Sequence, residues 1–368
     1  MKFKKFFQKC FKVFFQKIFI FFHGKIKTLD NDEIYGVKKN VISEIKLDKI
    51  FNLEKKYTIY EIEKGRIYTD TVENVAIIKN NCLLPVSFQQ LSGEIKNLKF
   101  NKVLSSGTPR IIKNFGGSVF NLTQGASGNN YFHFLFDILP KLKIYDQYKP
   151  FLDINYFYVP KITDWQANIF SILGINSKKL IDSNSHRHVR ADKILTVDHP
   201  WYYKGFVQNE VKNVPDWIIF WLREKFLHLS KKFNACELIF IDRSESTFNH
   251  CKLQNNQEVI EFLEKKGFKS YKVGQLDFFE QIYLFQNAKT IIGPHGAAFT
   301  NLVFCEPKTN VIEIIPNNHP SQKCQRISNL LNLNYIRINV PLLKNQNMNF
   351  GDMLISKDKL NLLIKDLI

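Results

Sequence analysis

The sequence has no Cys-x-x-Cys pair and no Cys/His spacing of the kind that binds zinc. Its six cysteines are scattered singly through 368 residues: Cys10, Cys82, Cys236, Cys251, Cys305 and Cys324. Isolated cysteines in a long chain exclude a disulfide-rich scaffold and are typical of free thiols in a reducing compartment.

Acidic residues are absent from residues 1–27, which contain eight lysines. The whole chain has a formal net charge of +18, so nearly half of the excess lies in this short segment. Strongly basic segments usually bind nucleic acid, anionic lipid or phosphorylated ligands. No basic-aromatic motif of a nucleic-acid reader is present, so we expect no nucleic-acid partner.

The N-terminal segment also lacks an uncharged run of about 20 residues, which excludes a membrane-spanning helix. No small-residue cleavage site follows its short apolar run, which argues against a signal peptide. Its periodicity predicts a helix, with Gly24 as a plausible C-cap. One face carries Phe3, Phe7, Phe11, Phe14, Phe15, Ile18 and Phe22, and most of the opposite face carries Lys5, Lys9, Lys12, Gln16 and Lys17.

A basic face opposite a Phe-rich face is typical of a helix lying in the headgroup region of a membrane. We therefore expect residues 2–22 to bind an anionic membrane surface, which places the protein on the cytoplasmic side of the inner membrane. The alternative is a helix docked on the core of the protein itself.

The remaining chain predicts an α/β protein of about two domains, because 368 residues exceed one ordinary core. Residues 31–100 are expected to form short strands, and residues 114–130, rich in turn residues, a loop. Long apolar patterns predict helices at 131–148 and 164–175, and strands at 154–160 and 192–198. A polar, aromatic connection then covers 198–215.

The second half alternates regularly. A helix is predicted over 216–229, followed by strands near 236–243, 268–273, 289–293 and 309–316, with helices near 256–267, 277–288 and 296–304 between them. This spacing predicts a parallel sheet covered on both faces. The expected organisation is a surface helix at 1–28, a first α/β domain at 29–205 and a second at 206–368.

Ligands of such sheets bind beyond the carboxyl ends of the strands. Arg243 and His295 directly follow two of the predicted strands, and Glu313 lies within a third. The stretch GPHGAAFTN is a strand-to-helix turn of small residues, in which backbone N–H groups can approach an anion closely. Taken singly, His295 could be a packed loop histidine and Arg243 a surface ion-pair partner. Together they favour a phosphate site.

These residues resemble glycosyltransferases of family 61. The resemblance is carried by FIDRSES, NNQEVIEFLEKKGF, IIGPHGAAFTNLVF and VIEIIP, and by the helix motif NNYFHFLFDILPKL, over roughly residues 115–340. It implies two Rossmann-like domains facing a cleft (the GT-B arrangement), a nucleotide-sugar donor such as a UDP-sugar, and inversion at the anomeric carbon.

The resemblance also assigns roles to residues of this chain. Arg243, His295, Gly296, Ala297 and Asn301 are implied to bind the donor, with Glu313 on its ribose or sugar hydroxyls. The family commonly carries a second basic residue, for which Lys252 is the nearby candidate. The resemblance further implies that no metal is required. In agreement, the sole Asp-x-Asp, at residues 30–32, falls in a linker and suits a solvated turn.

Inverting transfer needs one base for the acceptor hydroxyl. Asp137 and His133 are four residues apart on one predicted helix and share a face. Asp137 is our first candidate for the base, and His133 either orients it or acts itself. The pair could instead be a buried structural contact near Pro140. The expected function is transfer of a sugar to a lipid-linked or growing surface glycan. The alternative is a non-catalytic glycan- or nucleotide-binding protein of the same fold.

Overall fold

The structure is a computed structural model, and it describes residues 2–28, 36–47, 51–71, 74–91, 93–123, 130–201, 204–245, 250–343 and 351–365. The chain divides into two compact units, residues 1–207 and 208–368, which are described separately below. The Asp-x-Asp at residues 30–32 lies outside the described residues.

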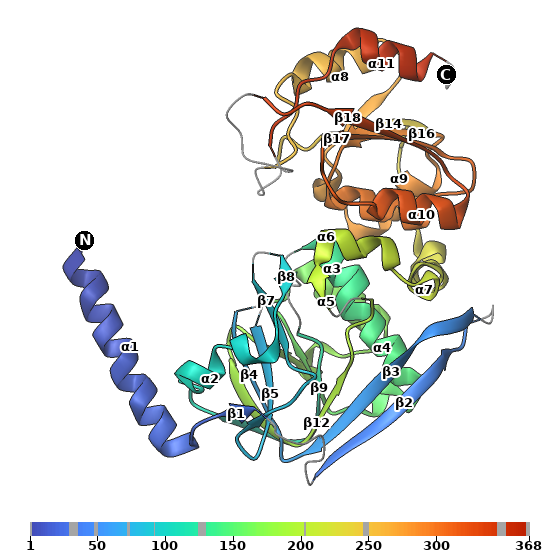
Figure 1. The fold of residues 1–368 in the computed structure, drawn as a ribbon. Coiled ribbons are helices and arrows are strands. Elements are labelled where there is room, and N and C mark those ends of the chain that lie inside the picture. Colours follow the sequence, from blue (N-terminus) through green and yellow to red (C-terminus); the bar gives the residue numbers. More distant parts are fainter. Residues whose placement is uncertain are drawn as a thin grey trace. The chain divides into compact units, whose positions relative to one another are not determined.

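Unit 1 is built on a 13-stranded mixed sheet (Figure 1). Its strands are β1 (Lys27–Thr28), β2 (Val37–Ile45), β3 (Phe51–Glu63), β4 (Arg66–Thr71), β5 (Asn74–Lys79), β6 (Cys82–Leu83), β7 (Phe88–Leu91), β8 (Glu94–Ile95), β9 (Lys113–Asn121), β10 (Tyr156–Val159), β11 (Leu180–Asp182), β12 (His188–Val197) and β13 (Gly205–Phe206). Its helices and helical turns are α1 (Lys2–His23), η1 (Leu98–Phe100), α2 (Val103–Ser106), α3 (Tyr131–His133), η2 (Phe134–Ile138), α4 (Leu139–Asp146), η3 (Phe151–Asp153), α5 (Asp164–Ile172) and η4 (Ser177–Lys179), with α6 (Val207–Glu210) at the border of the two units.

Only part of this sheet is Rossmann-like. The neighbours β11, β10, β9 and β12 run parallel in that order, which in chain order is 3-2-1-4. Strands β2 to β8 pair largely in antiparallel fashion, and β12 joins the two parts through β3 and β4. The expectation of a Rossmann-like first domain is therefore right for β9–β12 and wrong for residues 37–95, whose short strands form hairpins.

Residues 114–121 form strand β9, where the sequence predicted a loop. Their two glycines form a β-bulge: the pairing with β12 shifts between Ala191 and Lys193, and Gly117 has φ 77°. The N–H of Gly117 donates to Asp192 Oδ2 at 2.7 Å. Glycine here bends a strand locally and does not end it.

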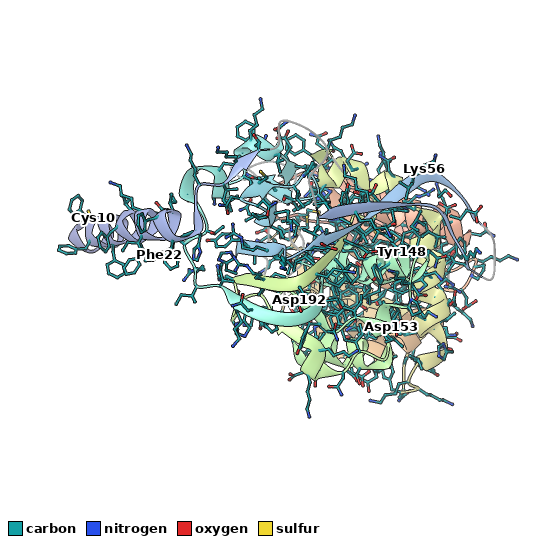
Figure 2. All side chains as sticks on the ribbon, turned by 90° about the horizontal axis from the view of Figure 1, so that it is seen from below. Cys10, Phe22, Lys56, Tyr148, Asp153 and Asp192 are labelled. Carbon is teal, nitrogen blue, oxygen red and sulfur yellow. The ribbon has the colours of Figure 1, made fainter. Side chains whose placement is uncertain are left out.

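Helix α1 has several exposed aromatic side chains. Phe7, Phe11 and Phe14 are each at least 60% exposed, and Phe22, which Figure 2 labels with Cys10, points outward. The side chains of Phe3, Lys5, Lys9 and Lys12 lie outside the described part of the chain. Among the described residues, no helix has the length and apolar character needed to cross a bilayer.

Unit 2 is a five-stranded parallel sheet with the order β15-β14-β16-β17-β18. Its strands are β14 (Leu238–Ile241), β15 (Lys269–Tyr271), β16 (Thr290–Pro294), β17 (Asn310–Pro316) and β18 (Asn334–Val340). Its helices and helical turns are η5 (Val211–Asn213), α7 (Asp216–Phe226), η6 (Leu227–Leu229), α8 (Asn256–Glu264), η7 (Val273–Gln275), α9 (Phe278–Gln286), η8 (Ala297–Phe304), α10 (Lys323–Leu331) and α11 (Lys357–Ile364).

The alternation predicted for this half is confirmed, and Figure 1 shows helices on both faces of the sheet. In chain order the strands read 2-1-3-4-5, the doubly wound order of flavodoxin-like sheets. Apolar side chains of the strands, such as Phe240 and Ile312, pack with Val259 of α8 in one buried cluster. Burial on both faces explains why these strands read as continuous apolar runs.

Candidate functional site

Each unit has one topological switch point, where the strand order reverses and a crevice opens beyond the carboxyl ends of the strands. In unit 1 it lies between β9 and β12, which are parallel neighbours. In unit 2 it lies between β14 and β16. Both switch points carry clusters of polar side chains, and these clusters are the candidate sites.

The helix that follows β9 is locally distorted. Asn130 caps its start, because its side chain accepts a hydrogen bond from the N–H of His133 at 3.3 Å. The next turn, η2, is π-helical and contains Asp137. Pro140 has no N–H to give to the carbonyl four residues before it, which favours a wider turn at this point. Such turns are frequent at functional sites.

Asp137 is the centre of the first cluster. His133 Nδ1 lies 2.6 Å from Asp137 Oδ2, and Trp201 Nε1 donates to Asp137 Oδ1 at 2.7 Å. His199 Nε2 lies 3.7 Å from Oδ2. Asp137 is 0% exposed, so its charge is held by donors and not by water.

The electrostatics keep Asp137 ionised. Burial pulls the pKa of this carboxyl upward, but the charges and hydrogen bonds of His133 and His199 outweigh burial, and the net pKa lies well below its usual range. Burial also lowers the pKa of Lys141, one turn further along, to about 7, although Asp137 pulls it upward. The ammonium of Lys141 lies 3.4 Å from the carbonyl oxygen of Thr123.

Of the two predicted acceptor-side residues, His133 is the one that reaches the surface. Its side chain is 12% exposed, whereas that of Asp137 is 0% exposed. Because Nδ1 faces the carboxylate, Nε2 is the nitrogen left for a ligand. The predicted pair thus exists. Its more exposed member is His133, and which of the two residues acts as the base stays a prediction.

Sequence reasoning missed His199, Trp201 and Lys141. His199 and Trp201 lie in the connection directly after β12, so the rule that ligands bind beyond strand ends, applied to unit 1, would have found them. Lys141 gives a weaker signal, a lysine four residues after Asp137 and so on the same helix face.

In unit 2, Arg243 follows β14 and His295 follows β16. The guanidinium of Arg243 donates to the carbonyl oxygen of His295. A Cβ atom on Gly296 would lie 2.4 Å from Nη1 of Arg243, so only glycine leaves room for this contact. The prediction that the strand ends bring Arg243 and His295 together is confirmed.

Glu313 positions His295. Its Oε1 lies 2.5 Å from His295 Nδ1 and accepts from Cys324 Sγ at 3.1 Å, while Tyr335 donates to Oε2 at 2.5 Å. Burial raises the pKa of Glu313. The charge of His295 and the hydrogen bonds outweigh burial, and the net pKa is about 2. The expected role of Glu313 on ribose or sugar hydroxyls is not supported here, because the residue is 1% exposed with both oxygens engaged.

The remaining residues predicted to bind the donor lie in two different environments. Gly296 and Ala297 lie at the start of η8, whose first N–H groups have no partner within the helix. Asn301 is 0% exposed, and its amide donates to Gln281 Oε1 at 2.9 Å, so it joins η8 to α9. Its expected contact with the donor stays a prediction.

A lysine other than Lys252 lies beside the small-residue turn. The ammonium of Lys323, at the start of α10, donates to the carbonyl of Gly296 at 2.8 Å. Lys252 lies before α8, where its carbonyl accepts from the N–H of Met353 at 2.7 Å. Sequence reasoning missed Lys323, which is the first residue of α10.

Three potential metal ligands meet within this network. The ligand atoms of His295, Glu313 and Cys324 all lie within 4.8 Å of one another. Burial raises the pKa of Cys324 well above its ordinary value, with Glu313 adding to it, and the thiol donates a hydrogen bond to Glu313 Oε1 at 3.1 Å.

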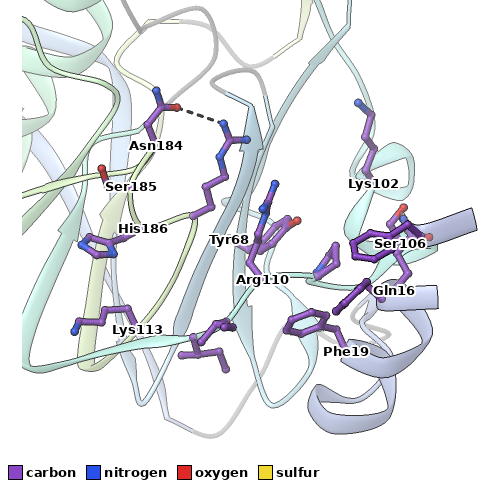
Figure 3. Close-up of a pocket in the computed structure, with 16 residues that line it drawn as sticks. Gln16, Phe19, Tyr68, Lys102, Ser106, Arg110, Lys113, Asn184, Ser185 and His186 are labelled. Carbon is purple, nitrogen blue, oxygen red and sulfur yellow. Dashed lines mark hydrogen bonds between the residues drawn. The ribbon is translucent and has the colours of Figure 1, made fainter. Parts of the chain in front are cut away.

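A separate pocket of about 1100 Å³ lies in unit 1 beside α1. Figure 3 shows Phe19 of α1 on one side and Lys113 and His186 on the other, with Arg110 between them. Among the residues that line it are four cations, Lys102, Arg110, Lys113 and Arg187, and no acid. This pocket combines aromatic and basic walls.

Comparison with known proteins adds two similarities. Residues 131–312 match the family model described as Glycosyltransferase 61. The matched range includes the unit 1 cluster and, from unit 2, Arg243 and His295, but ends before Glu313. The beta-1,2-xylosyltransferase RCN11 of Oryza sativa subsp. japonica is 30% identical to this chain over 135 residues. That match covers 33% of this chain and 25% of the relative. Both similarities support a glycosyltransferase of family 61.

Proposed function

We propose that this chain is an inverting glycosyltransferase that moves a sugar from a nucleotide-sugar donor to a hydroxyl group of a glycan. The observation that carries the proposal is that each unit has its own switch-point cluster, built on a histidine whose Nδ1 faces a buried carboxylate. Unit 1 supplies the group that accepts a proton, and unit 2 supplies the groups that hold the donor. A GT-B arrangement of the two units is part of this proposal.

On the acceptor side, His133 is the proposed base. The acceptor oxygen attacks the anomeric carbon, the bond from that carbon to the diphosphate oxygen breaks, and the hydroxyl proton passes to His133 Nε2. The carboxylate of Asp137 fixes the ring and stabilises the imidazolium that forms. Trp201, by holding the other oxygen of Asp137, keeps the carboxylate in place.

On the donor side, the leaving diphosphate needs positive charge. Arg243 and Lys323 both contact the His295–Gly296 turn, and the start of η8 follows directly. Guanidinium, ammonium and helix-start N–H groups together suit a diphosphate without a metal ion. We therefore propose a metal-independent reaction.

The deciding experiment is a transfer screen with the full chain and a panel of UDP-, GDP- and CMP-sugars. UDP-xylose is the first sugar to test, because the rice relative is named a xylosyltransferase. We expect turnover with one donor, unaffected by EDTA. Donor binding without turnover would favour a glycan- or nucleotide-binding protein, and a strict need for Mn²⁺ would contradict the metal-free reaction.

We further propose that α1 holds the enzyme at the cytoplasmic face of a membrane, next to lipid-linked or growing surface glycans. The exposed phenylalanines of α1 support this, as does the basic and aromatic lining of the adjacent pocket. Exposed aromatic side chains beside cations suit the interface between acyl chains and anionic headgroups.

A further inference from the structure

Two arginines face each other across neighbouring strands of unit 1. Arg66 of β4 and Arg190 of β12 are direct partners in the antiparallel register. Like charges in this position destabilise a sheet. The pair lies away from the helix that carries His133, and glycosyl transfer assigns it no role.

Arg66 is 5% exposed, yet its partners are neutral. Its guanidinium donates to Asn81 Oδ1 at 2.5 Å and lies 3.3 Å from His188 Nε2. His188 in turn has its Nδ1 2.9 Å from the carbonyl oxygen of Arg110, which places the proton on Nδ1. Burial lowers the pKa of His188 to about 3, with Arg66 contributing, so the imidazole is neutral and leaves the arginine charge uncompensated.

No carboxylate offsets this charge within the described residues. Burial and then Arg190 lower the pKa of Arg66 to about 10, so it stays charged at neutral pH. An uncompensated buried charge is unfavourable. The nearest acid in the lining, Asp192, accepts a hydrogen bond from the N–H of Gly117.

The two arginines open onto a pocket of about 490 Å³. Its lining also includes the cation Lys64 and the amides Asn80, Asn81 and Asn114. Within the described residues, the Arg190 and Lys64 side chains form no ion pair. The lining therefore has three cations and three amides against the single carboxylate of Asp192, and this net positive charge suits an anion.

We propose that this pocket binds a phosphate group, held by Arg66 and Arg190. A phosphate dianion would offset both arginines at once and accept bidentate hydrogen bonds from their planar guanidinium groups. The pocket adjoins the end of α1, because the His23 ring lies 5.7 Å from that of His188 and Gly24 packs against Asn81. The phosphate could therefore belong to a lipid headgroup or to a soluble ligand. Binding measurements with vesicles and with inorganic phosphate distinguish these two sources.

The test uses the full chain with Arg190→Gln, an exposed substitution, and Lys178→Gln as a control that removes the same charge from an exposed position outside the pocket. One arm titrates inorganic phosphate against matched chloride and follows heat of binding and unfolding temperature. The other sediments the protein with phosphatidylcholine vesicles, with and without phosphatidic acid. Arg66→Gln is a second variant, and its folding is first compared with that of the wild type by circular dichroism.

We expect Arg190→Gln to weaken phosphate binding about tenfold and Lys178→Gln to leave it unchanged. Loss of affinity for inorganic phosphate supports a soluble ligand, whereas loss confined to phosphatidic acid vesicles supports a headgroup. Equal behaviour of the two variants in both arms would overturn the proposal. Sugar transfer is measured separately, so failure of the phosphate site and failure of the proposed enzyme activity are distinguishable.

Discussion

The Nδ1 atom of His133 and the Oδ2 atom of Asp137 lie 2.6 Å apart on one helix. The other oxygen of the carboxylate is held by Trp201, 64 residues further along the chain. A carboxylate so enclosed fixes the orientation of the imidazole ring, as the proposed role of His133 requires.

Asp137→Asn is expected to lower kcat by roughly 10²- to 10⁴-fold, because the amide no longer fixes the ring or stabilises its charged form. Donor affinity should remain unchanged, since the donor groups lie in unit 2. Steady-state kinetics and nucleotide titration measure the two quantities. Asp146→Asn, at an exposed position of α4, is the matched control. An unchanged kcat for Asp137→Asn would remove this residue from the mechanism.

Arg243→Gln and Lys323→Gln should each weaken nucleotide binding about tenfold or more, because each removes a cation beside the His295–Gly296 turn. Lys252→Gln should leave binding within error of the wild type. Titration of UDP into each variant makes the comparison. Weaker binding by Lys252→Gln alone would restore the assignment made from sequence and refute the one based on Lys323.

Gly296→Ala should reduce donor affinity, because its Cβ would lie 2.4 Å from Arg243 Nη1 and push the guanidinium aside. The expected loss is about tenfold, similar to that of removing the arginine charge. Gly116→Ala is the control, since its Cβ would approach Asp192 Oδ2 only to 4.0 Å, an ordinary van der Waals distance. Equal affinity of both variants would mean that the Arg243 contact does not serve the donor.

Stability in acid should depend on Glu313. Burial raises the pKa of this carboxyl, but His295 and the hydrogen bonds outweigh it, and the folded-state pKa is about 2 against 4.5 for the free group. The stabilisation is thus present above pH 4.5 and is lost as pH falls toward 2. In Glu313→Gln the free energy of unfolding should fall less steeply over this range. Urea unfolding across pH measures it, with exposed Glu237→Gln as control, and parallel slopes for wild type and Glu313→Gln would contradict the assignment.

Phe7→Ser with Phe14→Ser should release the protein from anionic vesicles. Each phenylalanine is at least 60% exposed, and burial of such a side chain in the interface contributes about 1.5–3 kcal/mol. Phe100→Ser removes an equally exposed ring outside α1 and should leave sedimentation unchanged. Retention of the double variant on vesicles would refute the anchor.

The sequence predicted unit 2 better than unit 1 because its strands are buried on both faces and alternate with helices. In unit 1 the glycines at 116 and 117 resembled a turn, yet their conformation serves a bulge that is visible only once β12 is placed beside β9. The local amino-acid composition does not reveal which strand will pair with this segment.

The residues of the two candidate sites were predictable from the sequence only in part. Arg243 and His295 come directly after apolar strands, so their meeting follows from topology. The enclosure of Asp137, the hydrogen bond between Glu313 and Tyr335 and the contact of Lys323 with the Gly296 carbonyl depend on how distant segments pack. A carboxylate in an apolar helix indicates that buried hydrogen-bond donors surround it, but the sequence does not identify the residues that supply them.

The long separation of the partners around Asp137 has a consequence for folding. The helix that bears His133 can form from local interactions, whereas Trp201 arrives only when β12 has paired with β9. Pairing strands that are distant along the chain is slow compared with forming a helix. During refolding, helical signal should therefore return before catalytic activity, because turnover requires this long-range pairing of the first unit.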